Sequence, residues 1–184
     1  MENYKKNLGL LTKNHVYSKE MEHDACGVGL IASTEGKKSR AVVEYGIEAL
    51  KAVWHRGAVD ADGKTGDGAG IHVEIPKDFF IEKIQVTGHD YDNSEICVGM
   101  IFLPRNDYSA QENCKTIVES ELTKNNFSIY GWRQVPVNSK VLGEKALQTM
   151  PEIIQVLFKS NDPNLLDKNL ERKIYETRKK IENK

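Results

Sequence analysis

The chain has 184 residues, of which 39% are hydrophobic and 29% are charged, and its formal net charge is −1. This composition is sufficient for one core-forming domain. Because 26 basic residues nearly balance 27 acidic ones, no net field indicates a nucleic acid or an anionic membrane as a partner. No window approaches the roughly 20 apolar residues of a membrane span, and the N-terminus lacks the apolar region of a secretory signal.

The three cysteines are Cys26, Cys97 and Cys114, and no two of them form a CxxC pair. An odd number leaves a thiol over in any disulfide scheme, which favours a reducing compartment and hence a cytoplasmic location. A zinc site built from these cysteines and the five scattered histidines would lack the usual close ligand pairs, so no metal site is predicted.

A polar, patternless leader precedes the stretch "DACGVGLIA", in which Cys26 stands directly before an apolar run. The run Gly27–Ala32 is short and bounded by polar residues, which predicts a buried strand. Two interpretations of Cys26 follow. It is either a small core hydrophobe, since free cysteine is among the most buried residue types, or the first residue of a protein from which the leader has been removed.

The next predicted element is a helix over Ala41–Trp54. Its apolar stripe consists of residues at steps of four, three and four, while Glu44, Glu48 and Lys51 fall elsewhere. The members of the stripe are Val43, Ile47, Leu50 and Trp54. Gly57 is placed to end this helix.

A glycine-rich segment, "RGAVDADGKTGDGAG", follows over Arg56–Gly70 and has no core of its own. It is not a phosphate-binding loop, because that motif needs a glycine where Ala58 stands. It is not a calcium loop either, because Lys64, Thr65 and Ile71 occupy positions that require a ligand, a glycine and a glutamate. Two interpretations remain: a flexible surface linker, or a backbone that turns sharply and approaches something closely.

The rest of the chain alternates strand and helix patterns, so the fold class is mixed α and β. The predicted strands are Ile71–Ile75, which is half-buried and ended by Pro76, then Ile96–Leu103 and segments within Phe127–Val137 and Ile153–Phe158. A helix is predicted over Gln111–Lys124, with Cys114, Ile117, Val118 and Leu122 inward. A charged final helix has an apolar stripe that consists of Leu166, Leu170, Ile174 and Ile181.

Three stretches together resemble one family. "HDACGVGLIA", "ALKAVWHRGAVDADGKTGDGAGI" and "GWRQVPVNSKVLGEKALQTMPEIIQVLF" are similar to the start of the large subunit of bacterial glutamate synthase, in its class II glutamine amidotransferase domain. That domain is a member of the N-terminal-nucleophile hydrolases. The resemblance covers nearly the whole chain from Cys26 onward, and it implies that residues 1–25 are a propeptide and 26–184 the N-terminal part of the domain.

The resemblance implies a glutaminase with Cys26 as its nucleophile. A side-chain amide is a poor electrophile, so its hydrolysis benefits from a thiol with a base beside it. A free α-amino group on Cys26 has a reference pKa of about 8, close enough to neutrality to serve as that base. While Ala25 is attached the same nitrogen is an amide, so removal of the leader switches on the chemistry.

By the same resemblance, Arg56 and Gly57 lie near the nucleophile: Arg56 orients or electrostatically supports substrate and Cys26, and Gly57 offers backbone contacts. Asp67 is a weaker substrate-binding candidate. The implied fold is α+β, a four-layer αββα sandwich of which this chain supplies the N-terminal portion. No "NG" dipeptide occurs here, so the family's oxyanion donors are expected outside this chain, and the isolated chain is expected to be inactive.

The implied partners are L-glutamine, the remainder of the large subunit, and a small subunit or electron donor, with no nucleic acid and no membrane. No cofactor is expected in this chain; flavin mononucleotide and an iron–sulfur cluster are implied for the full-length parent. Two alternatives stay open. One is an amidotransferase with another ammonia acceptor, as in phosphoribosylamine or glucosamine-phosphate synthesis, and the other is a non-catalytic remnant that binds a partner.

Overall fold

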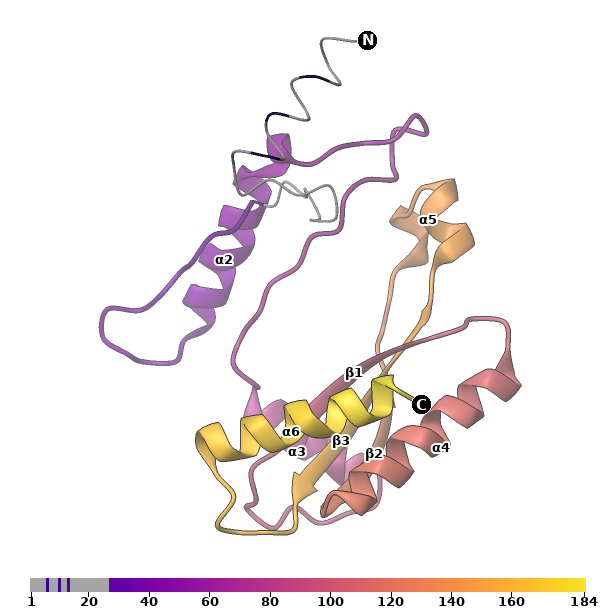
Figure 1. The fold of residues 1–184 in the computed structure, drawn as a ribbon. Helices are drawn as coiled ribbons and strands as arrows, with labels where there is room; N and C mark the ends of the chain where they lie inside the picture. Colours follow the sequence, from indigo (N-terminus) through magenta and orange to yellow (C-terminus); the bar gives the residue numbers. More distant parts are fainter. Residues whose placement is uncertain (1–5, 7–9, 11–12, 14–26) are drawn as a thin grey trace. The chain divides into compact units, whose positions relative to one another are not determined.

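The computed structural model describes residues 6, 10, 13 and 27–184, and these residues group into two compact units. The first unit includes residues up to Ala58 together with 69–71, and it contains helix α2 (Arg40–Ala52) and the short 3-10 helix η1 (Trp54–Arg56). The second unit includes 59–68 and 72–184 and contains the sheet with the remaining helices (Figure 1).

A three-stranded antiparallel sheet forms the centre of the second unit. Strand β3 (Glu152–Ser160) lies between β1 (Cys97–Leu103) and β2 (Phe127–Gln134), so the strand order is β1-β3-β2. Val156 is the register partner of Gly99 on one side and of Trp132 on the other. Strands predicted at Ile96–Leu103, within Phe127–Val137 and at Ile153–Phe158 are confirmed.

Two long helices, α4 (Tyr108–Lys124) and α6 (Asp167–Glu182), cover one face of this sheet (Figure 1). Both helices were expected from their apolar stripes. Helix α4 begins three residues earlier than predicted because the Asp107 carboxylate accepts a hydrogen bond of 2.9 Å from the backbone N–H of Ala110 and so caps it. The buried residues of this core are Cys97, Val118, Leu122, Phe127, Val156, Phe158 and Leu170.

Helix α3 (Lys77–Val86) packs on the opposite face of the sheet, where it places Phe80 and Ile84 against Leu157. Pro76 precedes its first residue, a position at which the missing N–H of proline costs nothing. At the other end of the helix, the Thr87 hydroxyl lies 2.8 Å from the carbonyl oxygen of Tyr130 on β2 and ties the helix to the sheet.

The connection from β2 to β3 contains the 3-10 helix η2 (Ser139–Val141) and the short helix α5 (Glu144–Thr149). Gly143 is the N-cap of α5, and Met150 and Pro151 separate α5 from the start of β3. Helix α5 is therefore joined to the central strand by only two residues.

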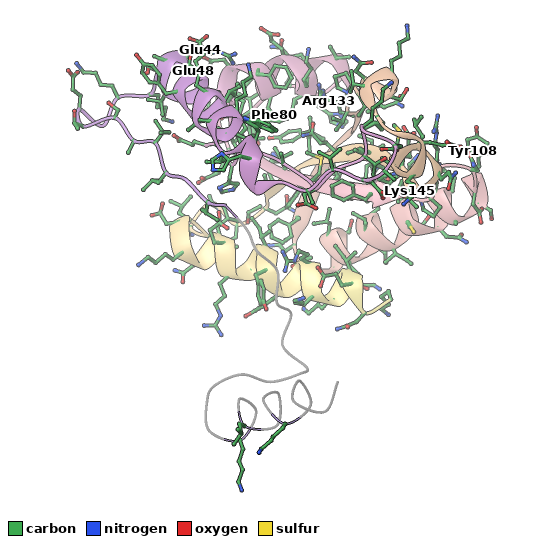
Figure 2. The ribbon with its side chains drawn as sticks, turned by 90° about the horizontal axis from the view of Figure 1, so that it is seen from above. Glu44, Glu48, Phe80, Tyr108, Arg133 and Lys145 are labelled. Carbon is green, nitrogen blue, oxygen red and sulfur yellow. The ribbon has the colours of Figure 1, made fainter. Side chains whose placement is uncertain are left out.

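In the first unit, the helix predicted over Ala41–Trp54 is confirmed as α2 followed by η1, which ends at Gly57. None of its residues is fully buried; Val43, Ile47 and Leu50 are half-buried. Glu44 and Glu48, labelled in Figure 2, are exposed, and Glu44 accepts a hydrogen bond of 3.1 Å from Arg40.

The strands predicted over Gly27–Ala32 and Ile71–Ile75 are wrong. Neither segment forms a strand, and their apolar side chains lie in solvent, with Val28 93% and Leu30 89% exposed. A strand needs a hydrogen-bonded neighbour, and among the described residues neither segment has one. The apolar pattern of a strand is present in both, but the pairing that would bury it is not.

Replacing Leu157, which is 0% exposed and lies at the centre of β3, tests the two-faced core. We expect Leu157→Ala to lower the free energy of unfolding by about 2–5 kcal/mol, because it removes buried methyl groups and leaves a cavity. Urea denaturation followed by circular dichroism measures the change. The matched control is Leu166→Ala, at a residue that is 50% exposed. An equal loss of unfolding free energy in both variants would contradict the placement of Leu157 in the core.

Candidate functional site

Cys26, the predicted nucleophile, lies outside the described residues, as does the leader apart from residues 6, 10 and 13. From Gly27 the chain runs without regular structure to the turn at 34–35.

Arg56 and Gly57 are adjacent at the end of the α2–η1 segment. Arg56 is the last residue of η1, and the backbone N–H of Gly57 donates a hydrogen bond of 3.0 Å to the carbonyl oxygen of Trp54. Trp54 is 77% exposed, and His55 and Gly57 are also exposed. Gly57 ends the helix, as its position in the sequence predicts.

Within the glycine-rich segment, residues 59–66 form a closed loop that belongs to the second unit. Val59 and Gly66 form an isolated antiparallel bridge, and inside it the backbone N–H of Asp60 donates to the carbonyl oxygen of Thr65 at 2.7 Å. At the tip, the N–H of Gly63 donates to the carbonyl oxygen of Asp60 at 3.0 Å, and Gly63 has a φ of 68° that few other residues adopt.

The Asp62 side chain stabilises this loop through hydrogen bonds to neighbouring loop residues. Its carboxylate accepts hydrogen bonds from the hydroxyl of Thr65 at 2.5 Å and from the backbone N–H groups of Lys64 and Thr65 at 2.9 and 2.7 Å. These bonds, the Thr65 hydroxyl first, hold the pKa of Asp62 well below its usual range. The stabilisation is therefore complete above the ordinary carboxyl pKa of about 4 and is lost as the pH falls toward the lowered pKa.

The loop contacts the N-terminal end of α5, 85 residues further along the chain. The ammonium of Lys145 lies 2.6 Å from the carboxylate of Asp60. The absence of a side chain at Gly143 makes this approach possible, because a Cβ there would collide with Thr65 and Asp62.

The structure brings only part of the predicted site together. Arg56 and Gly57 are adjacent in the first unit, whereas Asp67 is an exposed residue of the loop in the second unit. Sequence reasoning missed Gly143 and Lys145, because a contact across 85 residues leaves no periodic signal.

A groove of about 620 Å³ lies near one end of the sheet in the second unit, between α4 and strands β2 and β3. Arg133 of β2 and Tyr108 of α4, both labelled in Figure 2, line it together with Arg105 and Lys115. None of the predicted site residues lines this groove, so it is not assigned to the predicted chemistry.

The described cysteines do not form a metal or cluster site. Cys97 is buried in the core, where desolvation first and Glu95 second raise the pKa of its thiol to about 12. Cys114 is half-buried on α4, and within the described ranges no three His, Cys, Asp or Glu side chains gather closely enough to hold a metal ion. In the same part of the chain, no helix is both long and apolar enough to cross a membrane.

Comparison with known proteins gives consistent matches. The family model of the class-II glutamine amidotransferases matches residues 26–184. The NADPH-dependent glutamate synthase large chain of Azospirillum brasilense is 52% identical over 97% of this chain, and the ferredoxin-dependent glutamate synthase of Pyropia yezoensis is 39% identical over 94%. The NADH-dependent enzyme of Saccharomyces cerevisiae is 39% identical over 79%. The chain spans 12%, 11% and 7% of the length of these relatives, respectively.

Removing the Asp62 carboxylate tests whether it closes the loop. We expect Asp62→Ala to speed hydrogen exchange at the amides of Lys64 and Thr65 by about twofold to tenfold, because each amide loses its acceptor. Amide exchange followed by nuclear magnetic resonance at neutral pH measures this change. Asp90→Ala, in a separate loop, is the control and should leave both rates unchanged; unaltered exchange in the Asp62 variant would show that other contacts hold the loop closed.

Proposed function

The chain belongs to the class-II glutamine amidotransferases, and we propose that it is the glutaminase portion of glutamate synthase. In this role it hydrolyses L-glutamine to glutamate and ammonia, and the ammonia serves the reductive amination of 2-oxoglutarate elsewhere in the enzyme. The observation that carries the proposal is the start of the family match at residue 26, the position of Cys26.

The chemistry needs one residue to supply two groups. The sulfur of Cys26 attacks the carboxamide carbon of glutamine while its own α-amino nitrogen accepts the thiol proton. The C–N bond breaks with return of a proton to the leaving nitrogen, so ammonia departs and a thioester remains. Water then cleaves the thioester, which releases glutamate and restores the thiol.

Removal of residues 1–25 is the second part of the proposal. An amide nitrogen between Ala25 and Cys26 has no basic lone pair, so the base comes into existence only when that bond is cut. The Azospirillum brasilense match covers 97% of this chain and therefore includes most of the leader, which supports a leader that is present in the relative as well.

Arg56, Gly57 and Asp67 receive supporting roles. We assign Arg56 to orienting the glutamine or stabilising charge beside Cys26, and Gly57 to backbone contacts. Gly57 and the neighbouring Trp54 and His55 are exposed, which supports both assignments. Asp67, in the glycine-rich loop, is assigned to substrate binding.

The proposed architecture is a four-layer αββα sandwich, of which the described sheet is one inner layer and α4 with α6 an outer one. One observation supports it. Helix α3 covers the face opposite α4 and α6 only in part, and Met100 and Phe102 on that face are 50% and 63% exposed, as expected where a second sheet would pack.

The iron–sulfur cluster expected for a glutamate synthase does not fit the described cysteines. A cluster is held by several cysteine thiolates, whereas Cys97 is a core thiol with a raised pKa and Cys114 lies apart from it on α4. We therefore assign the cluster, and with it the flavin mononucleotide and the electron donor, to other parts of the glutamate synthase assembly. The free thiols support a cytoplasmic location.

Leader removal can be read directly from the mass of the purified protein. We expect the chain expressed with its leader to lose residues 1–25, so that sequencing from the N-terminus begins at Cys26. Intact-mass spectrometry measures the loss. Cys26→Ala is the matched variant for self-cleavage and should keep the leader if the thiol cuts the bond. A mature protein that hydrolyses glutamine while it still begins at Met1 would contradict the proposal.

The nucleophile is tested in a chimaera in which this chain replaces the matching segment of the Azospirillum brasilense large chain. We expect glutamine hydrolysis in the chimaera, and a loss of at least about 10³-fold with Cys26→Ser, because the weaker nucleophile is left with the same base. A glutamine-mimicking electrophile should label only the protein with Cys26. Cys114→Ser is the control and should retain labelling. A chimaera that is unlabelled and inactive would favour the non-catalytic alternative.

A further inference from the structure

The contact between the glycine-rich loop and α5 joins two parts of the chain that no sequence pattern connects. Two separate features make this contact: the Asp60–Lys145 ion pair and the missing side chain of Gly143, whose place lies against Thr65 and Asp62. Figure 2 labels Lys145 on α5. We call Gly143–Lys145 the loop seat.

The loop seat is closely connected to the central strand of the sheet. Helix α5 is separated from β3 by Met150 and Pro151 alone, and β3 is the central strand, hydrogen-bonded on both sides. The Val59–Gly66 bridge and the hydrogen bonds of Asp62 close the loop on itself, so the loop has a defined shape that does not depend on its contact with the loop seat. Its position within the second unit is thereby coupled to the sheet.

The loop also leads directly into one of the predicted site residues. Asp67 follows Gly66, whose bridge to Val59 closes the loop, and it lies in the same unit as α5. A shift of the loop away from the seat therefore changes where Asp67 is held. Since well-oriented groups account for much of the rate of an enzymatic step, small displacements of this kind lower the rate.

We propose that the loop seat positions the glycine-rich loop for glutamine hydrolysis, and that Lys145 is a positioning residue for that reaction. This inference rests on the proposed glutaminase function. Lys145 acts through Asp60 and not on the substrate, and its side chain is largely exposed, so its ion pair adds little to global stability. Its effect is confined to the loop and to the residues that the loop holds.

The first test measures the loop itself. In the chain, Lys145→Met should speed exchange of the Asp60 amide, which donates to the carbonyl oxygen of Thr65, by about threefold to fivefold, the most that losing a surface ion pair commonly allows. The melting temperature should not change. Lys168→Met, at an exposed residue of α6, is the control, and Lys145→Arg should restore protection.

The second test measures the reaction in the chimaera. Lys145→Met should lower kcat for glutamine hydrolysis by about threefold to fivefold with little change in KM, and Lys145→Arg should restore it. The double variant Asp60→Asn with Lys145→Met should be no slower than either single one, because both act through the same pair. Gly143→Ala should also lower kcat, because its Cβ would collide with Thr65 and Asp62 of the loop. Gly46→Ala, where a Cβ meets open space, should leave kcat unchanged.

The outcomes separate the two proposals. Faster exchange together with a lower, rescuable kcat supports the loop seat. Unchanged exchange, or faster exchange with an unchanged kcat, overturns the positioning role while the glutaminase function stands. Additive effects of the Asp60 and Lys145 substitutions also overturn it, because they would act independently. A wild-type chimaera without Cys26-dependent hydrolysis overturns the glutaminase function, and the positioning role of Lys145 with it.

Discussion

Strand β3 holds the larger unit together because its side chains are buried on both faces while its backbone is hydrogen-bonded on both edges. Val156 and Phe158 face α4 and α6, and Leu157 between them faces α3. Side chains at the centre of β3 are shielded from water on both faces, so they are apolar apart from Gln155, which accepts a hydrogen bond of 2.6 Å from Arg133. The helices on either side, and the connection through α5, take their places from this one strand.

Regular apolar patterns in the sequence predicted most of the described helices and strands, but not α3, although it buries Phe80 and Ile84. Helices α2, α4 and α6 and all three strands of the sheet follow from stripes or buried runs. The same reasoning failed for Gly27–Ala32 and Ile71–Ile75, because a strand pattern states which side would be buried but not which neighbour supplies the hydrogen bonds. A helix forms its backbone hydrogen bonds within itself, so an apolar stripe predicts a helix more reliably than an alternating pattern predicts a strand.

The candidate site divides in the same way. The turn at Gly57 could be predicted because a local rule, glycine after a helix, places it. The closure of the loop by Asp62 is also local, within three residues, but neither the phosphate-loop motif nor the calcium-loop motif describes it. The Asp60–Lys145 pair lies beyond any local rule, since its partners are 85 residues apart. The role of Cys26 follows from the resemblance and from chemistry, not from the fold.

Trp54 gives the candidate site a property of its own. It is one of two tryptophans in the chain, it is 77% exposed, and it lies in η1 two residues before Arg56. Trp132 differs, being partly buried against the sheet with its indole N–H donating to Glu119 at 2.7 Å. The emission of an indole depends on how much water surrounds it, so the two residues fluoresce at different wavelengths. The chain thus carries an intrinsic optical reporter beside Arg56 and Gly57, and a change in the surroundings of Trp54 can be followed without a dye.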